Sequence, residues 1–171
     1  FNLNMFLKLS KKEIRKIANE IGFDVPINLE MKNTLLTGKN NRMLRFNNKF
    51  KFNILLVYPN IICSTKKIYH KNNKFSLPGP KQNFSKMSKR ELIIFLKKEK
   101  NDLEKTVIKF YPKVEKIISI MQIQNGCYFS RITGSGSACI GIFSDMKAAI
   151  YAQKLMKLKF PKYWSVVSKT I

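Results

Sequence analysis

The chain has 171 residues, of which 44% are hydrophobic, and its 33 lysines and arginines outnumber ten acidic residues, giving a formal charge of +23. This length suffices for one good-sized domain, or for one domain and part of another. No apolar run approaches the roughly 18 residues of a membrane-spanning helix, and the first residues lack the pattern of a signal peptide. We therefore expect a cytoplasmic protein with no membrane partner.

The positive charge raises the question of a nucleic-acid partner, because lysine and arginine gain affinity by neutralising phosphates. Only five of the cations are arginines, the side chain best suited to bidentate phosphate and base contacts. The 16 asparagines, together with many lysines and isoleucines, are typical of an AT-rich genome. We expect no specific nucleic-acid partner, and a basic α+β RNA-binding module remains the alternative from another class.

Cysteine and histidine exclude further classes of site. Cys63, Cys127 and Cys139 are too far apart in sequence for a CxxC metal knuckle, so free thiols are expected. His70 is the only histidine, so neither a Ser-His-Asp triad nor a histidine-based metal site can be assembled within the chain. No metal-ligating residue is predicted.

The N-terminal part predicts one helix followed by short extended segments. Ser10 and Glu13 form the S-x-x-E pattern of a capping box, and apolar residues follow at helical spacing up to Gly22, which predicts a helix over 10–21. After the Asp24-Val25-Pro26 segment we expect extended segments at 27–31, 33–37 and 42–46. Residues 38–41, Gly-Lys-Asn-Asn, form a turn between the last two.

The remainder alternates strands and helices. We expect a strand at 52–58, a loop at 71–86, a helix beginning at the second capping box (Ser88 and Glu91), helices at 102–110 and 112–123, strands at 127–132 and 137–143, a helix at 145–158 and a strand at 164–171. This order permits a small antiparallel sheet backed by helices, as in a split βαβ or ferredoxin-like α+β fold. The fold alone does not select a function.

The two strands at 127–132 and 137–143 are separated by Thr-Gly-Ser-Gly-Ser, residues 133–137, called here the glycine turn. No lysine follows its glycines as in a Walker loop, and Cys139 stands where a dinucleotide fingerprint needs its third glycine. Two interpretations remain from spacing alone. The segment is either a tight serine-capped β-turn or a group of backbone amides that binds an anion, assisted by the hydroxyls of Thr133, Ser135 and Ser137.

Several segments, in order, resemble the GHMP kinase superfamily. Thr-Gly-Ser-Gly-Ser-Ala-Cys-Ile at 133–140 is similar to its C-terminal glycine motif, and Gly22-Phe23-Asp24-Val25-Pro26 to its Gly-x-Asp-Val-Pro segment. Pro59, Ser64-Thr65 and Tyr69 resemble a segment of the member that acts on a cytidine diphosphate-linked methylerythritol. Asn101-Asp102-Leu103-Glu104 and the stretch 164–167 are similar to its Asn-Asp-x-Glu helix start and last strand.

The resemblance implies a fold and an activity. Residues 1–50 would be the end of a ribosomal-protein-S5-like N-terminal kinase domain, and residues 51–171 a ferredoxin-like GHMP kinase C-terminal domain. The implied activity is phosphorylation of the 2-hydroxyl of this small-molecule substrate by ATP with Mg²⁺, in non-mevalonate isoprenoid biosynthesis. A superfamily kinase acting on another alcohol is a nearer alternative, and the oligomeric state is left open.

The resemblance also assigns residues. Asp24 would be the catalytic aspartate, Thr65 and Tyr69 would border the substrate, and Thr133, Gly134, Ser135, Gly136 and Ser137 would lie near bound phosphate. Local interpretations stand beside these: a turn aspartate for Asp24, a helix start and a core aromatic for Thr65 and Tyr69, and a purely structural helix start for Asn101, Asp102 and Glu104.

Two family features are missing from this chain. The central phosphate loop, P-x-G-x-G-L-G-G-S-S, is absent, as are the lysine and asparagine near the N-terminus of the family. The sequence begins with Phe1. We therefore expect a fragment that is inactive alone. Ser137 also stands where the family more often has a third glycine.

Overall fold

The computed structural model describes residues 9–22, 24–30, 32–37, 42–46, 50–77 and 82–170. The chain divides into two compact units, residues 1–49 with Ile171 and residues 50–170. The boundary expected from the sequence lies one residue later, between 50 and 51. Each unit is described by itself below, and the mixture of helices and sheets confirms the expected α+β class.

The first unit contains helix α2 (Lys11–Ile21), the 3₁₀ helix η1 (Pro26–Leu29) and a two-stranded antiparallel sheet of β1 (Asn33–Thr37) and β2 (Arg42–Phe46). The Ser10–Glu13 capping box is formed as predicted. The extended segment expected at 27–31 is wrong. Pro26 occupies the first turn of η1, where its fixed φ and missing amide favour a helical start.

The second unit begins with β3 (Asn53–Tyr58), α3 (Thr65–Lys71), η2 (Phe84–Lys86) and α4 (Lys89–Lys98), and continues with α5 (Glu104–Phe110), α6 (Pro112–Gln122), β4 (Cys127–Ile132), β5 (Cys139–Phe143), α7 (Met146–Lys159) and β6 (Trp164–Lys169). Helix α4 carries the second predicted capping box, between Ser88 and Glu91. Helix α3 begins at Thr65 with Ser64 as its N-cap, so the interpretation of this stretch as a helix start is correct. Tyr69 is 54% exposed and is not a core aromatic.

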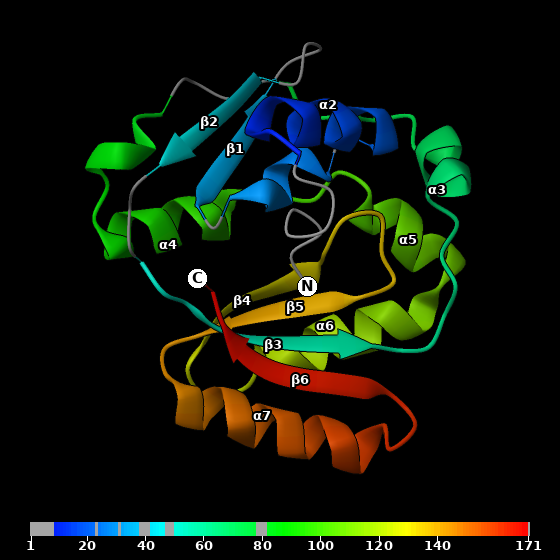
Figure 1. The fold of residues 1–171 in the computed structure, drawn as a ribbon. Coiled ribbons are helices and arrows are strands. Elements are labelled where there is room, and N and C mark those ends of the chain that lie inside the picture. The colour runs from blue at the N-terminus through cyan, green and yellow to red at the C-terminus, as the bar shows by residue number, and fades with distance from the viewer. Residues whose placement is uncertain are drawn as a thin grey trace. The chain divides into compact units, whose positions relative to one another are not determined.

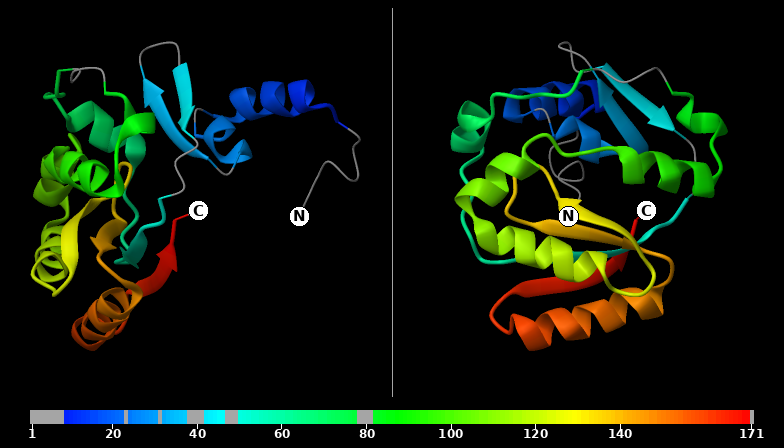
Figure 2. Two further views of the ribbon diagram at one scale, coloured as in Figure 1. Left: turned by 90° about the vertical axis from the view of Figure 1, so that its left-hand side faces the viewer. Right: turned by 180° about the vertical axis from the view of Figure 1, so that it is seen from behind.

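The four strands of this unit form an antiparallel sheet in the order β4-β5-β3-β6 (Figure 1). This is the strand order of a split βαβ, ferredoxin-like sheet. Helices α6 and α7 cover one face, as the right-hand view of Figure 2 shows. The core between these layers includes Leu55 and Val57 of β3, Phe143 of β5, Ile117 and Met121 of α6, and Ala149, Ala152 and Met156 of α7.

The opposite face of the sheet carries a smaller cluster. Phe52, Phe129 and Ile142 are buried there, and Leu92 and Leu96 of α4 pack against them. The alternation along β5 explains both clusters, since Cys139 and Phe143 face the large core while Ile140 and Ile142 face the small one. The two ends of the unit also meet: Phe52 and Thr170 exchange hydrogen bonds of 2.9 Å, from the Phe52 amide to the Thr170 hydroxyl and from the Thr170 amide to the Phe52 carbonyl.

The register of the central strands positions the glycine turn. Val57, near the end of β3, pairs with Cys139, the first residue of β5. The chain leaving β3 and the chain entering β5 therefore lie at the same edge of the sheet. Residues 59–65 and the glycine turn meet at this edge, although about 70 residues separate them in sequence.

Candidate functional site

The glycine turn connects β4 and β5 as a hydrogen-bonded turn. The Thr133 amide donates to the Ala138 carbonyl (2.9 Å), and the Gly136 amide donates to the Thr133 carbonyl (3.1 Å). Gly134 and Gly136 have φ of 57° and 81°, in the left-handed region that glycine adopts without steric cost. The tight turn, one of the two interpretations of this segment, is therefore present.

The turn nevertheless keeps backbone donors available. Within the part of the chain that the structure describes, the amides of Gly134 and Ser135 have no hydrogen-bond acceptor. Two consecutive free amides beside a left-handed glycine are the arrangement that binds anions in protein nests. The two interpretations of the sequence are thus compatible, since a bonded turn can offer free amides.

Residues after β3 contact the turn through side chains. The hydroxyls of Thr65 and Ser135 are 2.8 Å apart, and the Cys63 thiol donates to the Ser135 carbonyl at 3.2 Å. Burial raises the pKa of the Cys63 thiol, which keeps it in the protonated form that donates this bond. Ser137 is buried and its hydroxyl donates to the Ile61 carbonyl at 2.5 Å, so this side chain is engaged in the protein.

An open groove of about 530 Å³ lies beside the turn. This volume is within the range of small-molecule sites. The lining combines aromatic, basic and backbone groups: Tyr69, Phe75, Lys100, Asn101, Asp102, Leu103, Arg131, Ile132, Thr133, Gly134 and Ile140. The structure therefore brings Tyr69, Thr133 and Gly134 to one groove. The rings of Tyr69 and Phe75 lie at its edge, 6.5 Å apart between centroids and inclined by 23°.

Two charged groups of the groove, Arg131 and Asp102, are held in place by neighbouring residues. The Arg131 guanidinium donates to the Leu96 carbonyl and lies 4.2 Å from the centroid of the Phe129 ring. Partial burial lowers the pKa of Arg131, but a guanidinium remains charged in proteins. Asp102 accepts hydrogen bonds from the hydroxyl and amide of Ser76 at 2.5 and 2.8 Å, which lowers the pKa of its carboxyl.

The start of α5 contacts the turn in a way that sequence reasoning did not predict. The side-chain amide of Asn101 donates to the Gly134 carbonyl at 2.8 Å, and the Glu104 carboxylate accepts from the Ile132 amide at 2.9 Å. The Asn-Asp-x-Glu pattern was interpreted only as a local helix start. The pattern itself can be recognised in the sequence, but local spacing cannot show that Asn101 and Glu104 bind residues about 30 positions away.

Asp24 lies in the first unit, just beyond the C-terminal end of α2. Its side chain is exposed, and its carbonyl accepts a 2.9 Å hydrogen bond from the Asn28 side-chain amide. The Val25 amide donates to the Gly22 carbonyl at 3.2 Å, which makes a turn at this point. Asp24 belongs to the first unit and residues 133–137 belong to the second.

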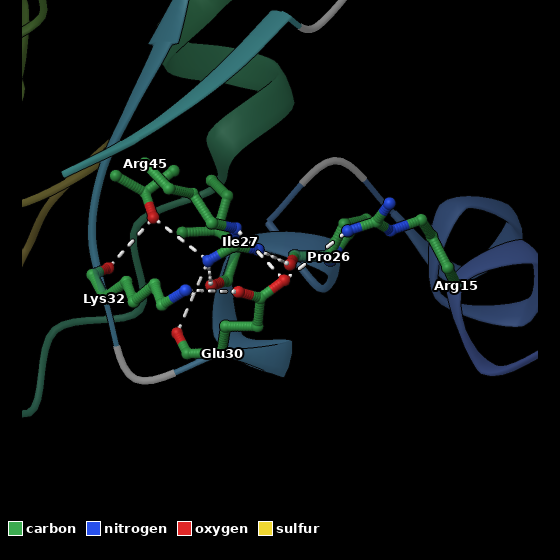
Figure 3. A network of polar contacts seen from close by, with 7 residues as sticks. Arg15, Pro26, Ile27, Glu30, Lys32 and Arg45 are labelled. Atoms are coloured by element: carbon green, nitrogen blue, oxygen red, sulfur yellow. Dashed lines mark hydrogen bonds and ion pairs between the residues drawn. The ribbon is translucent and has the colours of Figure 1, made fainter. Parts of the chain in front are cut away.

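The segment that follows Asp24 is held by Arg45 of β2 (Figure 3). Its guanidinium donates to the carbonyls of Pro26 (2.9 Å), Ile27 and Glu30 (both 3.4 Å) and to the Thr34 hydroxyl (3.2 Å). It also forms a 3.5 Å ion pair with the Glu30 carboxylate, which pairs with Arg15 as well. With 15% of its side chain exposed, Arg45 satisfies the carbonyls of the first two residues of η1 and of Glu30, the residue that follows η1.

A magnesium site formed by the chain alone would need clustered oxygen ligands. Among the described residues, no three or more His, Cys, Asp or Glu side chains lie together as such a cluster. Magnesium commonly retains waters and binds through one or two carboxylates together with substrate phosphates, so a nucleotide-dependent magnesium site does not require such a cluster.

None of the described helices is long and apolar enough to cross a membrane.

The chain is similar to proteins named as kinases. Residues 85–162 match the family model of the GHMP kinase C-terminal domain. The chain is 37% identical to 4-diphosphocytidyl-2-C-methyl-D-erythritol kinase of Pelagibacter ubique over 177 residues, covering 99% of the chain and 60% of that protein. It is 31% identical to the kinase of the same name from Wolbachia pipientis, covering 95% of the chain and 56% of the relative.

Solved structures give the same fold. A 4-(cytidine 5′-diphospho)-2C-methyl-D-erythritol kinase superposes with a TM-score of 0.67 at 19% identity, covering 96% of the chain and 60% of that structure. A homoserine kinase from Cytophaga hutchinsonii superposes with 0.68 at 14% identity, covering 99% of the chain and 61% of that structure. The chain thus spans about 60% of the length of the kinases it matches, and the resemblance to GHMP kinases is confirmed.

Proposed function

Because residues 85–162 match the family model of the GHMP kinase C-terminal domain, we propose that the natural protein phosphorylates the 2-hydroxyl of 4-diphosphocytidyl-2-C-methyl-D-erythritol with ATP, as a cytoplasmic step of non-mevalonate isoprenoid biosynthesis. The observation that carries this proposal is the 37% identity with a kinase of that name over 99% of the chain. Residues 1–50 would then complete an N-terminal kinase domain, and residues 51–171 would form the C-terminal domain.

In the proposed mechanism, Asp24 orients the acceptor hydroxyl and takes its proton. Phosphoryl transfer depends mainly on positioning and on stabilising the charge of the moving group, so one aligned carboxylate is sufficient as the base. The exposed carboxylate beyond α2 is consistent with this role. Arg45 supports it indirectly, by fixing the backbone that follows Asp24.

The glycine turn is proposed to approach the phosphates of ATP. The free amides of Gly134 and Ser135 fit an anionic ligand, and the groove that Gly134 lines carries the cations Lys100 and Arg131. The hydroxyls of Thr133 and Ser135 extend the donor set, while Gly136 and Ser137 shape the turn. When bound, ATP supplies the phosphoryl group and Mg²⁺ neutralises phosphate charge.

Thr65 and Tyr69 are proposed to border the cytidine diphosphate-linked alcohol. The exposed ring of Tyr69 offers an apolar face on which a pyrimidine could stack. Thr65 lies one hydrogen bond from Ser135, so a substrate against α3 would be adjacent to the glycine turn. This arrangement favours a site in which both ligands meet at one edge of the sheet.

The test is to express the protein with its complete upstream sequence and to measure ADP release with this alcohol and Mg-ATP. Asp24→Asn should reduce kcat about a thousandfold, within the range for a general base. Glu20→Gln is the matched control, because Glu20 is also an exposed acid near the end of α2. Full activity in Asp24→Asn would overturn the mechanism, and ADP release only with another alcohol would reassign the substrate.

The RNA-binding alternative makes an opposite prediction. It requires tight binding to RNA that weakens steeply as salt rises, whereas a kinase needs only weak and non-specific attraction. Fluorescence anisotropy with a labelled RNA across 50 to 300 mM salt, roughly the range where counterion release is measured, distinguishes the two. Submicromolar, sequence-dependent binding at about 0.15 M salt would favour the RNA-binding module.

A further inference from the structure

Asn101 contacts the glycine turn with one end of its side chain and its own helix start with the other. Its side-chain nitrogen donates to the Gly134 carbonyl at 2.8 Å and more weakly to the Ile132 carbonyl at 3.4 Å. Its side-chain oxygen accepts from the Leu103 amide at 3.0 Å. Both groups of the Asn101 amide are therefore used, and they connect α5 to the turn.

The geometry of a peptide unit makes this contact directional. In a trans peptide the carbonyl oxygen and the following N–H point in opposite directions within one plane. The peptide between Gly134 and Ser135 is trans. A hydrogen bond that holds the Gly134 carbonyl toward α5 therefore directs the Ser135 N–H away from α5.

The neighbouring peptide is fixed in the same way by the turn itself. The Thr133 carbonyl accepts the Gly136 amide at 3.1 Å, so the Gly134 N–H points away from the interior of the turn. Each of the two free amides thus has its direction set by a hydrogen bond to the carbonyl of its own peptide. One of those bonds comes from the backbone, and the other comes from Asn101.

We infer that Asn101 is a positioning residue that fixes the Ser135 N–H as a donor to an anion bound at the glycine turn. Glu104 assists by accepting a hydrogen bond from the Ile132 amide, which fixes the end of β4 from which the glycine turn begins. The identification of the anion as a phosphate of ATP rests on the proposed function. The orientation of the amide depends only on the contacts around the turn.

Asn101→Asp is the most direct test, carried out in the protein with its complete upstream sequence. Aspartate keeps the oxygen that accepts from Leu103, loses the donor to Gly134 and places a negative charge beside that carbonyl. The KM for ATP should rise about tenfold, consistent with loss of one oriented hydrogen bond and added repulsion, while the KM for the alcohol stays within twofold. Asn101→Ser, which retains a capping hydroxyl without the charge, should raise the KM for ATP about fivefold.

The matched control is Asn125→Asp, the same substitution at an exposed asparagine in the turn before β4. Asn125 makes no side-chain hydrogen bond within the described part of the chain. The Asn125→Asp substitution should leave the KM values for ATP and for the alcohol unchanged. Equal effects of Asn101→Asp and Asn125→Asp, or equal rises in both KM values, would overturn the inference.

A second measurement does not depend on activity. The ¹⁵N order parameter of the Ser135 amide should fall from about 0.85 in the unsubstituted protein toward about 0.6 in Asn101→Asp, with the amides of β5 unaffected. An unchanged order parameter would overturn the inference. If the unsubstituted protein releases no ADP with any alcohol, the proposed function fails, and the relaxation measurement still decides the role of Asn101.

Discussion

The segment that follows Asp24, residues 25–30, and the glycine turn both lie outside the α-helices and strands, yet they are held in different ways. One guanidinium, that of Arg45, holds three carbonyls after Asp24. The glycine turn is held by short side chains from several segments, including Cys63, Thr65 and Asn101. The first segment therefore depends on one residue, whereas the glycine turn is held by several residues.

The difference follows from what lies around each segment. The described residues of the first unit form a two-stranded sheet, helix α2 and the short 3₁₀ helix η1. Arginine is the side chain with enough donors to satisfy several carbonyls at once. The turn lies at the edge of a four-stranded sheet, where loops and α5 converge and each can contribute one contact. Substitutions should therefore have one large effect in the first unit and several smaller effects in the second.

The largest effect is expected for Arg45→Met. It leaves the carbonyls of Pro26, Ile27 and Glu30 without their donor, and loss of a largely buried charged side chain from such a network costs about 3 kcal/mol. Hydrogen exchange of the Val25 and Asn28 amides should accelerate correspondingly. Arg15→Met is the control, because Arg15 meets the same Glu30 carboxylate from an exposed position and should cost less than about 0.5 kcal/mol. Equal exchange in both variants would contradict the comparison.

Gly136→Ala and Gly134→Ala separate steric from conformational cost within the turn. An added Cβ at Gly136 meets a Val107 methyl at 3.0 Å, whereas at Gly134 it meets open space. Both positions have positive φ, so we expect about 2 kcal/mol for Gly136→Ala and about 1 kcal/mol for Gly134→Ala. Urea unfolding followed by the fluorescence of Trp164, the single tryptophan, measures both. Equal costs would show that Val107 does not limit the turn.

Thr65→Val should have a small effect, because it removes one contact of several. The exposed bond between the Thr65 and Ser135 hydroxyls contributes about 0.5 kcal/mol, and Thr65→Ser should restore it. The same urea titration applies. A loss as large as that of Arg45→Met would mean that the turn, too, depends on a single side chain.

The smallest effect concerns pH. Hydrogen bonds from Ser76 lower the pKa of Asp102 below its ordinary value of 3.8, so their stabilisation is complete above that pH and is lost as pH falls through the lowered value. The Ser76 amide resonance should therefore shift below about pH 4 and lose its protection from exchange. Asp102→Asn should abolish this dependence. A Ser76 amide that titrates identically in the variant would contradict the assignment.

Local patterns in the sequence predicted the parts of the fold that local interactions determine. The capping boxes at Ser10 and Ser88 formed because both partners lie within three residues. The segment at 27–31 was mispredicted because Arg45, in a later strand, captures the carbonyls of a short 3₁₀ helix. Apolar spacing cannot show such a contact.

The residues of the candidate site were predicted by resemblance, whereas the contacts between them depend on long-range interactions. Resemblance to a family supplied Asp24, Thr65, Tyr69 and the glycine turn, and their roles remain predictions. The contact of Thr65 with Ser135 and the clamp by Asn101 depend on the pairing of β3 with β5, which brings distant segments to one edge of the sheet. No local pattern in a single sequence predicts that these distant segments are in contact.

The paired hydrogen bonds between Phe52 and Thr170 hold the two ends of the second unit together. When the two ends of a unit lie close together, a short linker can join them and the chain can be opened at another loop. A circular permutant with new termini at exposed Asn73 and Lys74 would retain every strand pairing of the sheet. Since both ends lie side by side, we also expect the unit to tolerate insertion into a surface loop of another protein.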